Sequence, residues 1–405
     1  MIAALSRPRP VALLQEISGG FADIGLLAPL AIALITLNHL NATAVLAGAG
    51  LFYVITAAIY RLPVPVQPLK AVSAIAIASR LGPAGIAAAG LEIGAVFTLL
   101  GATGLADLLR KVFVNPVVRG VQLGIGLLLA KAAVDLILRK HQLLLGGDWL
   151  PVAIGFAAAG MLVLAELRRL PGAALALLAA GLALGVLAGT NRLPELALGP
   201  QPLQLALPSP GTFATAFWTL TVPQVGLSLG NSLMATSSAA RTYFGERGES
   251  VRPGRLGLSM GLANLVVSPL GGMPMCHGAG GMTAHYRMGA RSGVGIFVYG
   301  LALLAVGLLF GASAANVLGV LPVAVLGGFL LYVGVAHVTL VADLRGEREF
   351  LVAATVGALG LATGNITLGV LAGLAVHLAA TRLARKERRA EGGSEADQAL
   401  TTKGG

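Results

Sequence analysis

One short stretch of the chain combines residue types that can do chemistry. The segment "GGMPMCHGAGG", Gly271 to Gly281, contains the only cysteine, Cys276, beside one of six histidines, His277. A cysteine and a histidine can bind a metal ion, or act as a nucleophile with its base. The surrounding glycines suggest a third interpretation, in which the backbone is left bare so that a ligand can approach it.

The first two interpretations lack the partners they need. Adjacent side chains on a helix point about 100° apart, and the sequence has no second Cys-His cluster to complete a tetrahedral metal site. A nucleophilic Cys276 would need a base oriented by a third group, and no soluble substrate-binding domain surrounds it. We therefore expect no metal, no cofactor and no catalytic residue, with a polytopic membrane enzyme as the alternative.

Charged residues inside otherwise apolar stretches include Asp23, Lys70 and Glu92. A charge at the centre of a membrane helix costs at least about 2.5 to 3.5 kcal/mol on insertion scales, which makes Lys70 a candidate functional residue. The alternative is that Lys70 pairs with Asp23 or Glu92 in a structural ion pair.

The composition indicates the elements that must position these residues. The chain has 405 residues, of which 56% are hydrophobic and 11% charged, and its mean hydropathy is +0.84. Such values are typical of a membrane protein, and runs that are apolar on every side predict helices rather than a barrel. The net charge of +11 is scattered over loops and the C-terminus, so it does not predict a nucleic-acid partner.

The apolar runs predict fourteen membrane segments in two sets of seven. They span residues 15–38, 41–60, 68–79, 83–105, 114–138, 150–167 and 171–189, and then 222–240, 255–269, 276–288, 292–312, 320–341, 348–363 and 366–383. With both termini in the cytoplasm, nearly all loop arginines and lysines fall inside, as the positive-inside rule requires. The exceptions are Arg80, Arg139, Lys140 and Arg192.

The two sets resemble each other. Pro116 matches Pro322 at an offset of 206, Pro65 matches Pro274 at 209, and Gly19 matches Gln224 loosely at 205. Seven segments per set is an odd number, so the second set must be inverted, and inverted repeats are typical of transporters. We predict a first repeat over residues 1–190, an extracytoplasmic loop over 191–221, a second repeat over 222–385 and a cytoplasmic tail over 386–405.

The third and tenth segments predict half-helices. Pro63, Pro65 and Pro68 exclude a helix before Pro68, where Gln67 would be the cap, and Pro274 precedes a helix from about His277. In an inverted pair the two N-termini face each other at mid-membrane, where their free N–H groups favour an anion. The predicted anion site comprises Gln67, Pro68, Leu69 and Lys70 with Cys276, His277, Gly278 and Ala279.

The eighth segment adds polar side chains. Gln224, Ser228 and Asn231 follow spacings of four and three, which places them on one face of a regular helix. Neutral donors suit an oxyanion that must be bound and released. The alternative is that the serines only allow close helix packing.

Beyond these patterns, the segments "PVPVQPLKAVSAIA", "GGMPMCHGAGGMTAHYRMGARSG" and "GGFADIGLLAPL" resemble the signature segments and first helix of the molybdate transporter family related to the sulfate permeases. The resemblance spans both repeats. It implies an all-α fold of seven plus seven inverted helices with core and gate domains, shared with the sulfate and nucleobase permeases. It also implies that the first and eighth helices face the site.

The resemblance and the patterns together predict secondary active transport of a tetrahedral oxyanion, molybdate first, in a prokaryotic inner membrane. Asp23, Glu92 and His277 are candidates for proton coupling. A sulfate or other anion permease is the nearest alternative, followed by a nucleobase permease or a channel of the same fold. Lipid is the expected surrounding, and a homodimer is left open.

Overall fold

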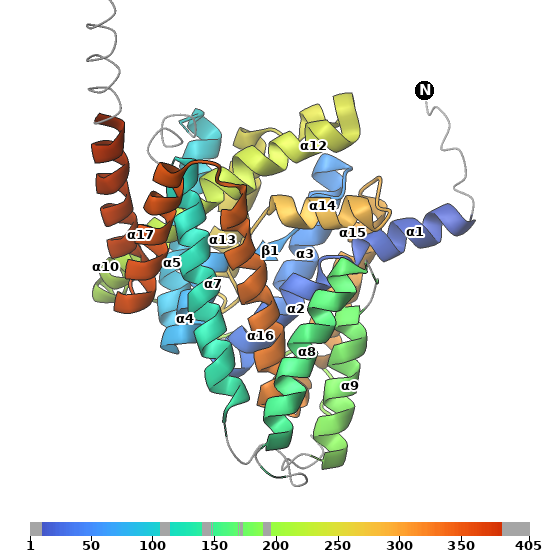
Figure 1. The fold of residues 1–405 in the computed structure, drawn as a ribbon. Coiled ribbons are helices and arrows are strands. Elements are labelled where there is room, and N and C mark those ends of the chain that lie inside the picture. The colour runs from blue at the N-terminus through green and yellow to red at the C-terminus, as the bar shows by residue number, and fades with distance from the viewer. Residues whose placement is uncertain are drawn as a thin grey trace, which may run out of the picture.

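The computed structural model describes residues 10–105, 114–139, 147, 149–168, 170, 173–188 and 196–382 (Figure 1). Several basic residues used for the orientation lie outside the described residues, as does the predicted tail 386–405: Arg7, Arg9, Arg110, Lys111, Lys140, Arg169 and Arg192. The orientation of the chain in the membrane and the repeat boundaries therefore stay predictions.

The described chain is almost entirely helical. Its first half contains α1 Pro10–Gly20, α2 Ile24–Thr36, α3 Ala42–Tyr60, α4 Lys70–Ser79, α5 Pro83–Thr103, α7 Asn115–Ile137, α8 Trp149–Leu167 and α9 Ala173–Ala188. Its second half contains α10 Pro210–Ala216, η1 Phe217–Thr221, α11 Val222–Leu227, η2 Ser228–Ala235, α12 Thr236–Phe244, η3 Gly245–Ser250, α13 Pro253–Val267, α14 Ala279–Arg287, α15 Val294–Gly319, α16 Val323–Val338, η4 Thr339–Asp343, α17 Glu347–Thr363 and a final helix Ile366–Arg382.

Six of the described helices are long and apolar enough to cross a membrane, namely α3, α5, α7, α8, α15 and α16 with its extension to Asp343. Shorter apolar helices lie between them, including α4 and the final helix. The prediction of a polytopic α-helical membrane protein is confirmed, while the number of fourteen segments stays a prediction.

A pair of very short strands crosses the middle of the molecule. β1 Gln67–Pro68 pairs antiparallel with β2 Met275–Cys276, and Gln67 lies opposite Cys276. Proline has no N–H, so the proline-rich lead-in cannot continue a helix and stays extended. The helices α4 and α14 begin directly after the strands and have 10 and 9 residues, which confirms the two predicted half-helices.

The packing of the helices follows the predicted repeat. Gln67 and Cys276 are 209 positions apart, the offset that relates Pro65 to Pro274, so equivalent residues face each other in the strand pair. α3 packs on α15, while their counterparts α13 and α5 pack on each other; α7 packs on its own counterpart α16. A twofold axis between two repeats exchanges each helix with its counterpart, so it turns the α3–α15 contact into the α13–α5 contact.

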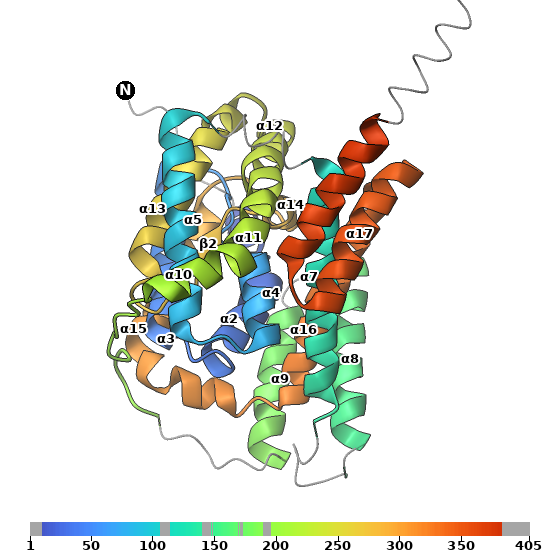
Figure 2. The ribbon, with the colours of Figure 1, turned by 90° about the vertical axis from the view of Figure 1, so that its left-hand side faces the viewer.

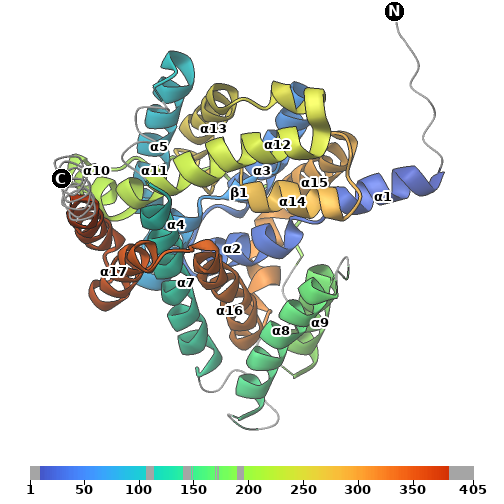
Figure 3. The ribbon, with the colours of Figure 1, turned by 45° about the horizontal axis from the view of Figure 1, so that its top comes forward.

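The helices form two groups that lie side by side (Figure 2 and Figure 3). The core group contains α1 to α5 and α10 to α15 with the strands, and the gate group contains α7 to α9, α16, η4, α17 and the final helix. Small residues allow close crossings within each group: a Cβ at Gly300 of α15 would lie 2.8 Å from the Gly50 carbonyl oxygen of α3.

The first and third predicted segments differ from the structure. The first segment is interrupted at residues 21–23, where Gly19 and Gly20 press against the backbone of Ala290 and Gly295. The half-helix α4 begins at Lys70, its N-cap is Leu69, and Gln67 belongs to β1 instead of capping it.

The eighth segment differs most from its prediction. Helical structure begins at Pro210 instead of 222 and contains two π-helical stretches, η1 and η2. Such stretches inside a helix are frequently found at functional sites.

Candidate functional site

A chain of buried polar contacts links three predicted site residues. The Lys70 ammonium donates to Gln67 Oε1 at 2.6 Å, and Gln67 Nε2 donates to Asp23 Oδ1 at 2.5 Å. Tyr53 of α3 donates its hydroxyl to Asp23 Oδ2 at 2.9 Å. Asp23 lies at the break between α1 and α2, so the break places its carboxylate against the lead-in of the first half-helix.

Lys70 therefore does not pair directly with a carboxylate among the described residues; Gln67 stands between it and Asp23. An ammonium carries three donors, and within the described chain Gln67 is the one acceptor bonded to it. Lys70 is 8% exposed, so it is a nearly buried cation with donors to spare.

The start of the second half-helix lies against this lysine. A Cβ added at Gly278 would come within 2.1 Å of Gln67 Oε1 and 2.8 Å of Lys70 Nζ. Gly278 is the N-cap of α14, and the first N–H groups of a helix have no partner within it. A Cβ added at the exposed Gly280 would meet nothing within 4 Å. The N-cap of α14 and the Lys70 ammonium thus lie next to each other.

The Gln224 side chain caps the helix α4, and its amide nitrogen is hydrogen-bonded to Ser228 instead of being free for an anion. Its Oε1 accepts from Ala71 N at 2.8 Å and Val72 N at 3.3 Å, and its Nε2 donates to Ser228 Oγ at 2.8 Å. The first N–H groups of α4 are therefore capped by a side chain from the other repeat. The two half-helices differ: Gln224 caps the N-terminus of α4, whereas α14 has no side-chain hydrogen bond at its N-cap.

Asn231 does not join Gln224 and Ser228. It lies in η2, half-buried, and its side chain has no hydrogen-bond partner within the described chain. A π-helix closes i→i+5 hydrogen bonds, so three residues turn the chain through less than the rotation assumed from the sequence. The predicted single face holds for Gln224 and Ser228 and fails for Asn231.

His277 is turned away from Lys70 and fully engaged. Its Nδ1 lies 2.8 Å from the Pro65 carbonyl oxygen and its Nε2 lies 2.9 Å from Ser259 Oγ. A carbonyl only accepts, so Nδ1 carries the proton and Nε2 accepts from Ser259. The ring is 0% exposed and joins the lead-in of one half-helix to that of the other and to α13.

The remaining predicted residues are placed as follows. Cys276 is buried, and its Sγ faces the Pro68 carbonyl oxygen at 3.9 Å. Leu69 N donates to the Pro274 carbonyl oxygen at 2.8 Å, which fixes the two lead-ins together. Ala279 is half-buried in the first turn of α14. Among the described residues, His, Cys, Asp and Glu form no group of three that could hold a metal ion.

Glu92 lies apart from these residues. It is half-buried on α5 and accepts from Thr221 Oγ1 of η1 at 2.6 Å. No contact within the described chain links it to Asp23 or Lys70.

Sequence reasoning missed residues that surround Asp23. Tyr53 bonds it directly, and the fully buried Tyr299 and His285 are close enough for its charge to act on them. His285 Nδ1 lies 2.8 Å from the Gly19 carbonyl oxygen, while its Nε2 and the Tyr299 hydroxyl have no partner among the residues that the structure describes. The available signal was a titratable residue, His285, within the predicted membrane segment 276–288.

Comparison with protein families gives a match over both halves of the chain. Residues 15–129 and 216–336 match the model described as "Molybdate transporter of MFS superfamily".

Curated proteins give the same relationship along nearly the whole chain. "Molybdate transporter 2" of Arabidopsis thaliana is 29% identical, covering 90% of this chain and 86% of that protein. "Molybdate transporter 1" of Arabidopsis thaliana is 31% identical, covering 89% and 86%. "Molybdate transporter 1" of Chlamydomonas reinhardtii is 30% identical, covering 89% and 90%.

Solved structures show where the fold occurs elsewhere. The transmembrane domain of the cyanobacterial bicarbonate transporter BicA aligns with a TM-score of 0.62 and 18% identity, over 91% of this chain and 98% of that one. The murine Solute Carrier 26 family member A9 anion transporter, in its inward-facing state, aligns with a TM-score of 0.64 and 14% identity, over 92% and 69%. At these identities the likeness concerns the fold.

Proposed function

Because the chain belongs to the molybdate transporter family whose model matches both of its halves, we propose that it carries molybdate across a membrane by secondary active transport. Its helical membrane fold is that of the solved anion carriers of the sulfate permease type, as the sequence resemblance predicted. In this proposal the substrate crosses chemically unchanged.

The observation that carries the proposal is the meeting of Lys70 with the start of α14. The Lys70 ammonium has unused donors, and Gly278 brings the first turn of α14 within contact of it. An oxyanion held there would accept from the ammonium and from backbone N–H groups at the positive end of the helix. In this proposal the residues 67–70 and 276–279 form the cradle, and the strand pairing of Gln67 with Cys276 holds its two sides together.

The balance of charge in the cradle suits transport. Lys70 is the single full positive charge of this cradle, and Gln67 ties it to the carboxylate of Asp23. The remaining donors are neutral. A dianion bound this way keeps part of its charge uncompensated, which favours release once the site opens to water.

Movement of the core group against the gate group would provide alternating access. Both half-helices belong to the core group, as do Gln224, which caps α4, and Ser228, which accepts from Gln224, so the cradle can move as one unit. The gate group meets it through α7, which packs on α4 and α11.

We further propose Asp23 as the residue that couples transport to protons. It is 3% exposed, it bonds Gln67 directly, and the unpaired Nε2 of His285 lies within reach of its charge. Protonation of Asp23 would release Gln67 and alter its hold on Lys70. Glu92 is the weaker candidate because its contact is with Thr221, away from this chain.

The proposed setting is a prokaryotic inner membrane with both termini in the cytoplasm. This orientation rests on the excess of arginine and lysine in the loops assigned to that side.

Uptake into liposomes tests the proposal. Purified protein is reconstituted, and accumulation of labelled molybdate is followed with and without an imposed pH gradient, in the presence of sulfate, tungstate or uracil. We expect saturable molybdate uptake, competition by tungstate, and no effect of uracil. Preferred competition by sulfate would make the chain a sulfate permease instead.

A failure of molybdate to accumulate, together with accumulation of uracil, would overturn the anion proposal. Chemical turnover of a substrate by the purified protein would instead indicate a membrane enzyme.

A further inference from the structure

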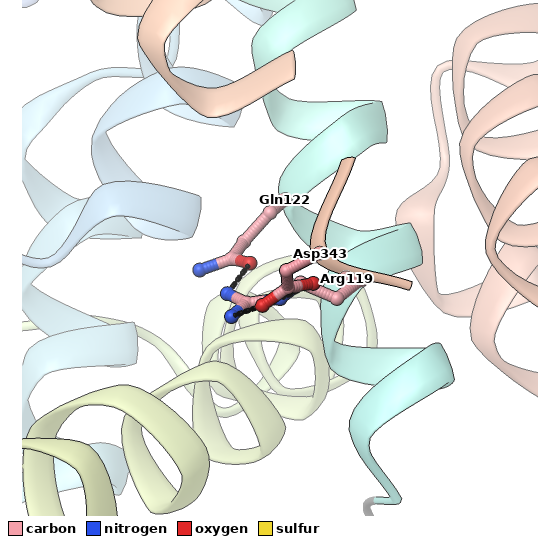
Figure 4. A network of polar contacts seen from close by, with 3 residues as sticks. All are labelled: Arg119, Gln122 and Asp343. Carbon is pink, nitrogen blue, oxygen red and sulfur yellow. Dashed lines mark hydrogen bonds and ion pairs between the residues drawn. The ribbon is translucent and has the colours of Figure 1, made fainter. Parts of the chain in front are cut away.

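A polar triad joins the start of α7 to the end of η4, which follows α16 (Figure 4). Arg119 Nε donates to Asp343 Oδ1 at 2.9 Å, Arg119 Nη2 pairs with Asp343 Oδ2, and Arg119 Nη1 donates to Gln122 Oε1 at 2.8 Å. The arginine and aspartate side chains are 22% and 48% exposed, whereas Gln122 is 2% exposed. The two charges near the surface thus hold an amide that lies inside the protein.

The chemistry of arginine fixes which way this amide points. A guanidinium only donates, so Gln122 must present its oxygen to Arg119 and direct its NH₂ group the opposite way. Within the described chain Gln122 Nε2 has no hydrogen-bond acceptor. It is also not one of the unpaired polar atoms that are fully buried, so it keeps contact with solvent. Two oriented donors are therefore free.

The neighbours of α7 show where these donors lie. One turn before Gln122, Val118 packs on Gly230 of η2, with its Cγ1 3.3 Å from a Cβ built there. One turn after it, Gly126 meets Gly334 and Val338 of α16. Residues four apart lie on nearly the same face of a helix, so Gln122 projects between η2 of the core group and α16 of the gate group.

The two gate helices beside Gln122, α7 and α16, also lie near Lys70. α7 packs on α4, whose first residue is Lys70. His337 of α16, adjacent to Val338, is close enough to Lys70 for the lysine charge to act on its ring. Gln122 and Lys70 thus lie on helices that meet at the boundary between the gate group and the core group.

We propose that Gln122 is an anion-binding donor supplied by the gate group, and that Arg119 and Asp343 are residues that position it. The inference rests on the proposed function and extends it. An anion between Lys70 and Gln122 would touch both groups of helices at once, so binding would depend on how the gate sits against the core.

The decisive variant is Gln122→Glu. A carboxylate of the same size still accepts from Arg119, so any purely structural role is retained, but the two donors are replaced by an acceptor that repels an anion. We expect the half-saturation concentration for molybdate in liposomes to rise about tenfold or more, as for the loss of one hydrogen bond to a charged group. The unfolding temperature should not fall. Gln204→Glu, at an exposed loop residue, is the matched control and should behave as wild type.

Arg119→Gln tests the positioning role. It should raise the half-saturation concentration less than Gln122→Glu, and the double variant Arg119→Gln with Gln122→Met should be no worse than Gln122→Met alone, because Arg119 acts through the amide of Gln122. Gln122→Met, which removes the donors without adding charge, serves if Gln122→Glu does not fold.

The outcomes separate the two proposals. If wild type shows no saturable molybdate uptake, the proposed function fails. If wild type takes up molybdate and a folded Gln122→Glu or Gln122→Met variant keeps its half-saturation concentration, only the inference about Gln122 is overturned.

Discussion

Gly278 is the residue at which the addition of a single methyl group should reduce molybdate uptake most. Its missing side chain lets the start of α14 approach Gln67 and Lys70, and Gln67 cannot give way because both ends of its amide are bonded. Cys276, in contrast, has one weak contact, at 3.9 Å to a carbonyl oxygen. The glycine, rather than the reactive-looking cysteine, gives the segment "GGMPMCHGAGG" its role in the proposed site.

Gly278→Ala should therefore reduce molybdate uptake by roughly a hundredfold, since a Cβ at 2.1 Å from Gln67 Oε1 forces the lead-ins apart. Gly160→Ala, where nothing lies within 4 Å, is the control. Cys276→Ser should keep most of the uptake because only its backbone faces the site. Molybdate uptake is measured for the three variants. Loss of uptake in Cys276→Ser, together with normal uptake in Gly278→Ala, would refute the role given to Gly278.

Asp23→Asn tests proton coupling at the same scale. An amide cannot take up the proton, so accumulation driven by a pH gradient should disappear while exchange of labelled for unlabelled molybdate continues. The measurement compares both modes in the same liposomes. Unchanged pH dependence would remove Asp23 as the coupling residue and return attention to Glu92.

At the scale of elements, the half-helices could be foreseen and the eighth segment could not. Pro63, Pro65 and Pro68 exclude a helix whatever surrounds them, and the offset between Pro65 and Pro274 anticipates the pairing of Gln67 with Cys276. Such local constraints are visible in the sequence. The π-helical turns of η2, which separate Asn231 from Ser228, depend on packing between helices and have no comparable signal.

The cap that Gln224 forms on α4 joins two elements of different repeats. Gln224→Ala leaves the N–H groups of Ala71 and Val72 buried without an acceptor, which should lower the free energy of unfolding by about 1 to 3 kcal/mol. Thermal unfolding of purified protein measures this, with Gln204→Ala as the exposed control. An unfolding temperature equal to that of wild type would show that the cap is dispensable.

At the scale of the whole molecule, the account requires the core group to move against the gate group. Val118 of α7 and Gly230 of η2 face each other across that boundary, and a Cβ at Gly230 would lie 3.9 Å from the Val118 Cβ. This separation suits a disulfide. Cysteines at both positions, in a Cys276→Ser background, should stop uptake when oxidised and restore it when reduced.

A matched pair within the core group serves as control. A Cβ at Gly48 of α3 also lies 3.9 Å from the Cβ of Val267 in α13. A disulfide at this second pair should leave uptake intact, because α3 and α13 move together. Full uptake with the Val118 and Gly230 cysteines oxidised would exclude the proposed motion.

Binding of molybdate to purified wild type and Lys70→Met protein tests the central claim most directly, since Lys70 is the charge around which the proposed site is built. Titration calorimetry should give saturable binding to wild type and an affinity at least about tenfold lower for Lys70→Met, with both proteins folded. Equal affinity for the two proteins would contradict the account.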